Sequence, residues 1–207
     1  DEFGLEVVRG AEAGVKSIGA ELAEKTSFKR GATDFSSQVA RMKSSGCDLV
    51  VLGTIIRETI GTIGEARKTG FSPVFLGTTA AYTDLIHKLG GKAMDGLYAA
   101  MTVQAPYVDD ASSQPLRFWA NKYKTKFNED PTYGYIIIDL FARAAQKAGP
   151  GLSTDSFIKA MDSLNVPSDI FGSPPLSFTA TKRLGNDESR LSQIQDGRWK
   201  PVSDYFR

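Results

Sequence analysis

The stretch Cys47-Asp48-Leu49-Val50-Val51-Leu52-Gly53 decides the fold class of this chain. It is a short, continuous run of apolar and β-branched residues, which is typical of a parallel strand covered on both faces. A helical pattern follows at residues 60–67 and ends at Gly70, and Val74-Phe75-Leu76-Gly77 has the composition of a second strand. This alternation of strand and helix predicts an α/β fold with a doubly wound parallel sheet.

Two helices are predicted upstream of the first strand. Across residues 5–23, apolar residues recur at helical spacing on one side of the pattern: Val7, Val8, Ala11, Val15, Ile18 and Leu22. Phe35, Val39 and Met42 give a second, shorter pattern, which Asp34 and the two serines after Phe35 are suited to cap. The second pattern leads directly to the predicted strand at residues 47–53.

The alternation breaks near residue 102. A helix is predicted at residues 84–89 and a strand at residues 97–102. Beyond Pro106 come two helices with no strand between them: residues 116–127 form an amphipathic helix, and residues 133–148 form one that is apolar on most sides. Such a break predicts a change of lobe.

The last part of the chain has antiparallel character. After one more predicted helix at residues 153–164, apolar and polar residues alternate at 174–179 and again at 191–195. Asp196-Gly197 is a tight-turn pair, and residues 199–202 are expected to pair back across it.

Composition excludes several classes of function. The chain has 207 residues, of which 41% are hydrophobic and 24% charged, so a folded protein is expected. Lys and Arg number 25 against 24 Asp and Glu, so nothing favours nucleic acid or an anionic membrane as a partner. The single Cys47 and the single His87 cannot supply a zinc site, and no metal or cofactor is expected.

The sequence also lacks the usual enzyme motifs. It contains no Gly-x-Gly-x-x-Gly after a strand, no P-loop, no nucleophile elbow and no His-Glu-x-x-His. The apolar runs are far shorter than the roughly 20 residues that cross a bilayer. The remaining candidates are the loops after the two strands, residues 53–57 and 77–80, because ligands of open α/β sheets bind at the carboxyl ends of strands. Each loop is as consistent with a plain connection as with a ligand site.

Several local patterns together resemble one family, the type I periplasmic binding proteins of the leucine/isoleucine/valine-binding and amide-binding branch. The stretches that carry the resemblance are Asp1-Glu2-Phe3-Gly4, Asp34-Phe35-Ser36-Ser37-Gln38-Val39, Cys47-Asp48-Leu49-Val50-Val51-Leu52-Gly53, Gly70-Phe71 with Phe75-Leu76-Gly77, and residues 178–202. The last of these resembles the closing hairpin of the family, which ends in Asp-Gly-x-(Tyr/Trp)-x-Pro-Val. The likeness covers nearly the whole chain, and the order and spacing of the motifs are more specific than any one of them.

The resemblance implies two Rossmann-like lobes with parallel sheets, joined by crossovers, with the ligand held between the lobes. It implies that residues 1–101 form most of the C-terminal lobe, residues 102–170 part of the N-terminal lobe, and residues 171–207 a crossover and the closing hairpin of the C-terminal lobe. The chain begins where the first strand of the second lobe ends in the family. A preceding N-terminal segment of the same protein is therefore expected as a partner.

The resemblance further implies capture of a small-molecule ligand in the periplasm and delivery to the membrane permease of an ABC transporter, without catalysis. A signal peptide is expected to lie outside this chain. The same fold also serves as a ligand-sensing domain of receptors and amide-type regulators, and a Rossmann-like enzyme is a third reading.

Aromatic ligand contacts of the family fall on several positions of this sequence. Phe3 stands where the family has a ligand-stacking tyrosine, and Ile55 or Ile56 stands where amino-acid binders have another aromatic contact. Tyr133 matches an aromatic of the first lobe that contacts ligand, and Tyr135 matches nearly as well. We expect Phe3, Ile55, Ile56 and Tyr133 to line the ligand site.

Thr54 and Thr79 are the expected polar residues of the same site. Thr79 stands where amino-acid-binding members have the glutamate that pairs with the ammonium group of the ligand. A neutral hydroxyl in that place leaves a buried cation without its counter-charge, which is costly. The resemblance and this departure together predict an aromatic or aliphatic carboxylate as the ligand, and not a free amino acid.

Overall fold

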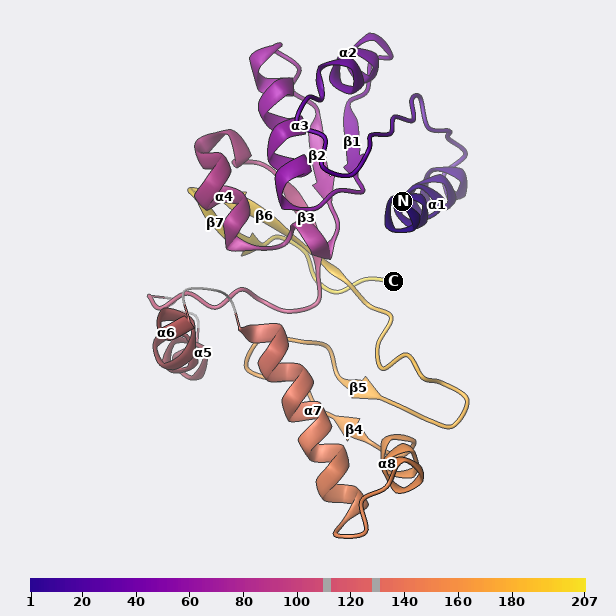
Figure 1. Cartoon of the computed structure of the whole chain (residues 1–207), viewed down its shortest axis with the longest axis vertical. Helices are drawn as coiled ribbons and strands as arrows, with labels where there is room; N and C mark the ends of the chain where they lie inside the picture. Colours follow the sequence, from indigo (N-terminus) through magenta and orange to yellow (C-terminus); the bar gives the residue numbers. More distant parts are fainter. Residues whose placement is uncertain (110–112, 128–130) are drawn as a thin grey trace. The chain divides into compact units, whose positions relative to one another are not determined.

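The computed structural model describes residues 1–109, 113–127 and 131–207. The chain divides into two compact units. Unit 1 comprises Asp1–Met101 and Arg190–Asp204, and unit 2 comprises Thr102–Ser189 and Tyr205–Arg207. Unit 1 therefore joins the yellow strands near the end of the chain to the indigo and magenta segments of its first half (Figure 1).

Unit 1 is built on a mixed five-stranded sheet with the strand order β1-β2-β3-β6-β7. Its strands are β1 (Leu49–Leu52), β2 (Val74–Gly77), β3 (Tyr98–Met101), β6 (Arg190–Gln195) and β7 (Arg198–Pro201). The first three run parallel, whereas β6 pairs antiparallel with β3 and with β7. The predicted α/β class is confirmed, with an antiparallel hairpin added to the parallel part of the sheet.

Two helices of unit 1 precede β1, and the other two lie between consecutive parallel strands. The four helices are α1 (Glu2–Ser17), α2 (Ser36–Ser44), α3 (Ile56–Lys68) and α4 (Asp84–Gly90), with 3-10 turns η1 (Thr79–Ala81) and η2 (Gly91–Met94). Local chemistry sets their ends. The Asp1 carboxylate accepts a hydrogen bond from the Gly4 N–H at 3.2 Å, and Gly70, with φ of 67°, lies just past the end of α3.

The sheet of unit 1 is covered on one face and open on the other near β1. Val50 and Leu52 are buried, whereas Leu49 and Val51 expose 48% and 37% of their surface. The prediction that this strand is covered on both faces is therefore wrong for the described part of the chain. This exposure fits the helices, because α1 contributes no buried residue whereas α2 and α3 bury two and five (Figure 1).

The first helix also ends earlier than its apolar pattern predicts. The pattern placed Ile18 and Leu22 on the helix, but α1 ends at Ser17. Gly19 follows with φ of 74°, a left-handed conformation that glycine adopts without steric cost and that commonly ends helices. Ile18 exposes 79% of its surface, so the apolar spacing continues past the point where the backbone leaves the helix.

The other predicted elements of unit 1 are confirmed within a few residues. The β6–β7 hairpin turns at Asp196-Gly197, where both residues have positive φ, of 54° and 70°. Trp199 in β7 donates its indole N–H to the Thr83 carbonyl oxygen at 3.0 Å. This bond ties the hairpin to the residue that caps α4.

Unit 2 is mainly helical. Its helices are α5 (Gln114–Trp119), the π-helical turn η3 (Ala120–Lys124), α6 (Thr125–Phe127), α7 (Thr132–Ala148) and α8 (Thr154–Met161). The two helices predicted without an intervening strand are thus present, the first of them interrupted by the π-turn. Two short strands, β4 (Asn165–Val166) and β5 (Leu176–Ser177), pair antiparallel. A small core gathers Trp119 and Phe171, whose rings meet edge to face at 4.8 Å between centroids.

The longest helix of unit 2, α7, leaves much of its apolar surface exposed. Only Thr132 and Ala144 are buried along it. Ile137, Ile138 and Phe141 expose 63%, 65% and 53% of their surface. None of the described helices in either unit is long and apolar enough to cross a bilayer.

Candidate ligand-binding site

The carboxyl ends of β1 and β2 lie side by side in unit 1. The two strands are parallel, and Leu52 pairs in register with Gly77. Thr54 and Thr79 each stand two residues beyond these paired positions, so they emerge at the same edge of the sheet. The structure therefore brings together the two polar residues expected at the site, at the edge where open α/β sheets bind ligands.

Thr54 is held by a short chain of hydrogen bonds. Its hydroxyl lies 2.6 Å from the Thr59 hydroxyl, and Thr59 donates to the Ile55 carbonyl oxygen at 2.7 Å. Thr54 exposes 6% of its surface and Thr59 none, so both hydroxyls are shielded from water. These bonds fix the loop between β1 and α3.

Ile55 and Ile56 form the apolar part of the same loop. Ile55 is the N-cap residue of α3, without a side-chain hydrogen bond to the first turn, and it exposes 42% of its surface. Ile56 is the first helical residue and is partly buried. Thr79, at the start of η1, is exposed, and its neighbour Thr78 caps that turn by accepting from the Ala80 N–H at 3.3 Å.

The beginning of α1 reaches this edge as well. A side chain added at Gly53, which directly follows β1, would lie 3.1 Å from the Cβ atom of Val7. The first turns of α1 therefore pack closely on the strand end. Phe3 lies in the first of these turns and exposes 39% of its surface. Five of the six expected site residues, all but Tyr133, thus belong to one edge of unit 1.

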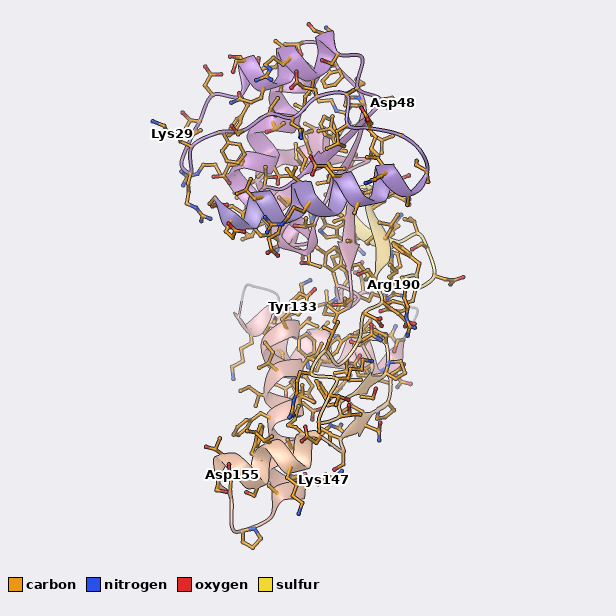
Figure 2. All side chains as sticks on the ribbon, turned by 90° about the vertical axis from the view of Figure 1, so that its right-hand side faces the viewer. Lys29, Asp48, Tyr133, Lys147, Asp155 and Arg190 are labelled. Atoms are coloured by element: carbon orange, nitrogen blue, oxygen red, sulfur yellow. The ribbon has the colours of Figure 1, made fainter. Side chains whose placement is uncertain are left out.

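Tyr133 belongs to unit 2, at the start of α7, where Figure 2 labels it. It exposes 40% of its surface and lines a cavity of about 480 Å³ formed by residues of unit 2 alone. Tyr135, the alternative match, lies between the rings of Trp119 and Phe171, with centroids 5.8 and 6.0 Å away. Tyr135 therefore packs against the small aromatic core of unit 2.

An ion pair lies in the wall of the same cavity. Arg143 donates to the Asp139 carboxylate at 2.6 Å, one helical turn away on α7. This hydrogen bond raises the pKa of the Arg143 guanidinium above its usual value. Because the guanidinium is already positive at neutral pH and half of its side chain is exposed, the pair holds two side chains in place and contributes little stability.

Sequence reasoning missed two residues at the edge of unit 1, Thr59 and Glu58. Both are buried, Glu58 with 4% of its surface exposed. The available signal was spacing: a threonine four residues after a carbonyl in a helix commonly donates its hydroxyl to that carbonyl. In the described ranges, no group of three His, Cys, Asp or Glu side chains is placed to hold a metal ion.

Comparison with known proteins agrees with this architecture. The sequence profile of the periplasmic binding protein family matches residues 1–198. The chain belongs to this family. Its fold and its relatives are those of the type I, branched-chain-amino-acid branch, as the sequence patterns indicated.

One curated relative of this chain is the Leu/Ile/Val-binding protein homolog 8 of Brucella abortus, 24% identical over 208 residues. The alignment covers 95% of this chain and 50% of that protein, so the chain spans about half the length of the relative.

Two solved structures share the fold at low identity. A branched-chain amino acid ABC transporter protein of Thermus thermophilus with bound valine has a TM-score of 0.80 at 19% identity, over 96% of this chain and 56% of its own. A fatty acid ABC transporter substrate-binding protein of Thermomonospora curvata also reaches 0.80, at 21% identity, over 96% of this chain and 53% of its own.

Proposed function

We propose that the protein is the periplasmic solute-binding component of an ABC importer and captures a small organic ligand at the edge of unit 1. The observation that carries this proposal is the shared edge of β1 and β2, where exposed apolar side chains stand beside threonine hydroxyls. The family match over residues 1–198 supports it. Tyr133 is a further expected ligand contact, as the resemblance implies, and the ligand leaves chemically unchanged.

The favoured ligand is an aromatic or aliphatic carboxylate. Phe3, Ile55 and Ile56 offer apolar surface, whose burial against a ring or chain contributes about 25 cal/mol per Å². Thr79 offers no negative charge for an ammonium group. A solved structure named as a fatty acid ABC transporter substrate-binding protein supports an acid as the ligand class, whereas the structure with bound valine represents the competing class.

A binding screen of the full-length protein tests this ligand class. We expect 4-methylpentanoate, hexanoate or benzoate to raise the melting temperature, since a ligand that binds only the native state stabilises it, and leucine and valine not to do so. Phe3→Ala removes the shift, whereas Ile18→Ala, just past the C-terminal end of α1, keeps it. Stabilisation by leucine but by none of the acids contradicts the proposed class.

Thr79→Glu sharpens the same test. The new carboxylate supplies the counter-charge that an α-ammonium group needs, so we expect leucine binding to appear or to strengthen at least about tenfold. Thr79→Gln is the matched control, because it adds similar bulk without charge. Equal effects of both substitutions would show that position 79 does not face the ammonium group.

The exposed face of α7 supports a further partner, a segment of the same protein that covers this helix. Ile137, Ile138 and Phe141 are spaced as one apolar helix face, and the described strands of unit 2 have only two residues each. Relatives are about twice as long as this chain, so they contain the additional chain that such a cover requires. We take that cover to be an apolar sheet N-terminal to the present residues.

The substitution Ile138→Ser tests whether the apolar face of α7 is covered in the full-length protein. In the 207-residue chain alone we expect less binding of a hydrophobic dye and a stability change within about 0.5 kcal/mol, because the side chain is exposed. In the full-length protein the same substitution costs about 2–4 kcal/mol if the helix is covered. Leu89→Ser, exposed on α4 of unit 1, is the control and stays neutral in both. A neutral Ile138→Ser in the full-length protein contradicts the proposed cover.

A further inference from the structure

In the hydrogen bonds that link Thr54, Thr59 and the Ile55 carbonyl at the end of β1, each donor can be assigned. Thr59 has one hydroxyl proton, and it donates this proton to the Ile55 carbonyl oxygen at 2.7 Å, an atom that only accepts. The Thr54 and Thr59 hydroxyl oxygens lie 2.6 Å apart, so one of them must donate to the other. Because the Thr59 proton is already used, Thr54 is the donor.

This direction decides what Thr54 offers to a ligand. Its only proton points to Thr59, so lone pairs are all that remain for a third group. Burial makes the arrangement stable, since Thr54 and Thr59 expose 6% and 0% of their surface and a broken bond would leave a buried polar group unpaired. Thr54 is therefore an acceptor at the ligand edge, and Thr59 is the positioning residue that makes it one.

Glu58 places a second acceptor in the same turn. It lies in the first turn of α3, exposes 4% of its surface, and its Oε2 atom has no hydrogen-bond partner in the described part of the chain. Side chains of a helix lean toward its N-terminus, which here is the loop that carries Thr54. Buried polar atoms are rarely left without a partner, so this oxygen calls for a donor from outside unit 1.

We propose that this corner, formed by Thr54 and Glu58, selects ligands that carry a hydrogen-bond donor beside their apolar body. The inference rests on the proposed function. For an acid, it means that a hydroxy acid binds better than the plain acid of the same skeleton. The hydroxyl donates to the corner, and the carboxylate lies away from Glu58 because like charges repel.

Three probes with one carbon skeleton test the proposal on the full-length protein: 4-methylpentanoate, 2-hydroxy-4-methylpentanoate and leucine. They differ only in hydrogen, hydroxyl or ammonium at carbon 2. Titration calorimetry gives each Kd. We expect the hydroxy acid to bind about 5–10-fold more tightly than the plain acid, the ratio that one additional hydrogen bond gives.

Variants then locate the preference. Thr54→Val and Glu58→Gln each bring the ratio of the two acids toward one, while Thr54→Ser keeps it. Thr59→Val frees the Thr54 hydroxyl to donate and lowers the ratio without touching ligand, and Thr59→Ser restores it. Thr69→Val is the matched control, because Thr69 also donates to helix carbonyls, at the opposite end of α3.

Each outcome decides between the two proposals. Equal binding of the two acids, or a ratio unchanged in Thr54→Val and Glu58→Gln, overturns the donor requirement and leaves the proposed function in place. If leucine binds most tightly and these variants weaken it, the ligand class fails and the donor requirement stands. If none of the three probes binds, and benzoate and 4-hydroxybenzoate do not bind either, both are overturned.

Discussion

Helix α3 in unit 1 and helix α7 in unit 2 show how differently two amphipathic helices are buried in one chain. Five residues of α3 are buried, from Glu58 to Ala66, whereas the longer α7 buries Thr132 and Ala144. The difference is the neighbouring sheet: α3 packs in a unit with five strands, and the described sheet of unit 2 has two strands of two residues. An apolar helix face is therefore buried only where the neighbouring sheet is large enough to cover it.

The two tryptophans allow the units to be followed separately. Trp199 lies in unit 1 and Trp119 in unit 2, and they are the only tryptophans of the chain. In a Trp119→Phe background fluorescence reports on unit 1, and in a Trp199→Phe background it reports on unit 2. Urea titrations in these backgrounds test the contrast between the units.

Phe75→Ala should have the largest effect. Phe75 lies in the middle of β2 with 2% of its surface exposed, so its removal leaves a closed cavity and costs unit 1 about 3–5 kcal/mol. The Trp199 signal should unfold at lower urea, while the Trp119 signal stays unchanged. Loss of both signals together would show that the two units unfold as one.

Phe171→Ala should cost less, about 2–3 kcal/mol in unit 2. Phe171 is as buried as Phe75, with 1% of its surface exposed, and packs on Trp119. However, it lines the cavity of unit 2, where neighbours can relax and water can enter. A cost equal to that of Phe75→Ala, measured by Trp119 fluorescence, would show that unit 2 is packed as tightly as unit 1.

Trp199→Phe should cost unit 1 about 1–2 kcal/mol. The substitution keeps an aromatic ring against Tyr82, whose centroid is 5.0 Å away, but it removes the hydrogen bond to the Thr83 carbonyl oxygen. Circular dichroism during urea unfolding measures the change. Phe206→Leu, exposed on the last bridge of the chain, is the control and should stay within about 0.5 kcal/mol.

Asp34→Ala should have the smallest effect, and one that depends on pH. The Asp34 carboxylate accepts from the Ser36 backbone N–H at 2.9 Å, and this bond lowers the pKa of Asp34. A carboxyl group with a lowered pKa stabilises the fold above its unfolded pKa of about 3.9, and the contribution is lost as pH falls through the folded value. The difference between wild type and variant should therefore shrink below about pH 4, whereas Ser37→Ala changes no charge and shows no such trend.

Sequence patterns predicted the positions of helices and strands better than they predicted which faces of those elements are buried. The strand at Val74–Gly77 lies where the apolar run placed it, because the run and the flanking Gly70 leave little choice. The cover of Leu49 and Val51 was not predictable, because an apolar strand has the same composition whether or not a helix lies over both faces. The apolar spacing predicted a longer α1, but the helix ends before Gly19, whose backbone is in the left-handed conformation.

For the site, the rule about strand ends was sufficient to find Thr54 and Thr79, since parallel register brings such residues to one edge. This rule could not identify Thr59 or Glu58, because the role of a buried hydroxyl or carboxyl depends on distances of a few tenths of an ångström. That these residues bind ligand, and that Tyr133 joins them, stays a prediction.

The two edge strands of the described unit 1 sheet differ in how readily they would pair with a strand of another molecule. β7 ends the sheet with Arg198, Lys200 and Pro201, where charge and a missing N–H discourage added strands. β1, at the other border, is Leu-Val-Val-Leu, with two of its side chains exposed and no such residue among them. For the 207-residue chain taken alone, growth of this sheet at high concentration would therefore proceed from β1, and a lysine at position 51 should slow it.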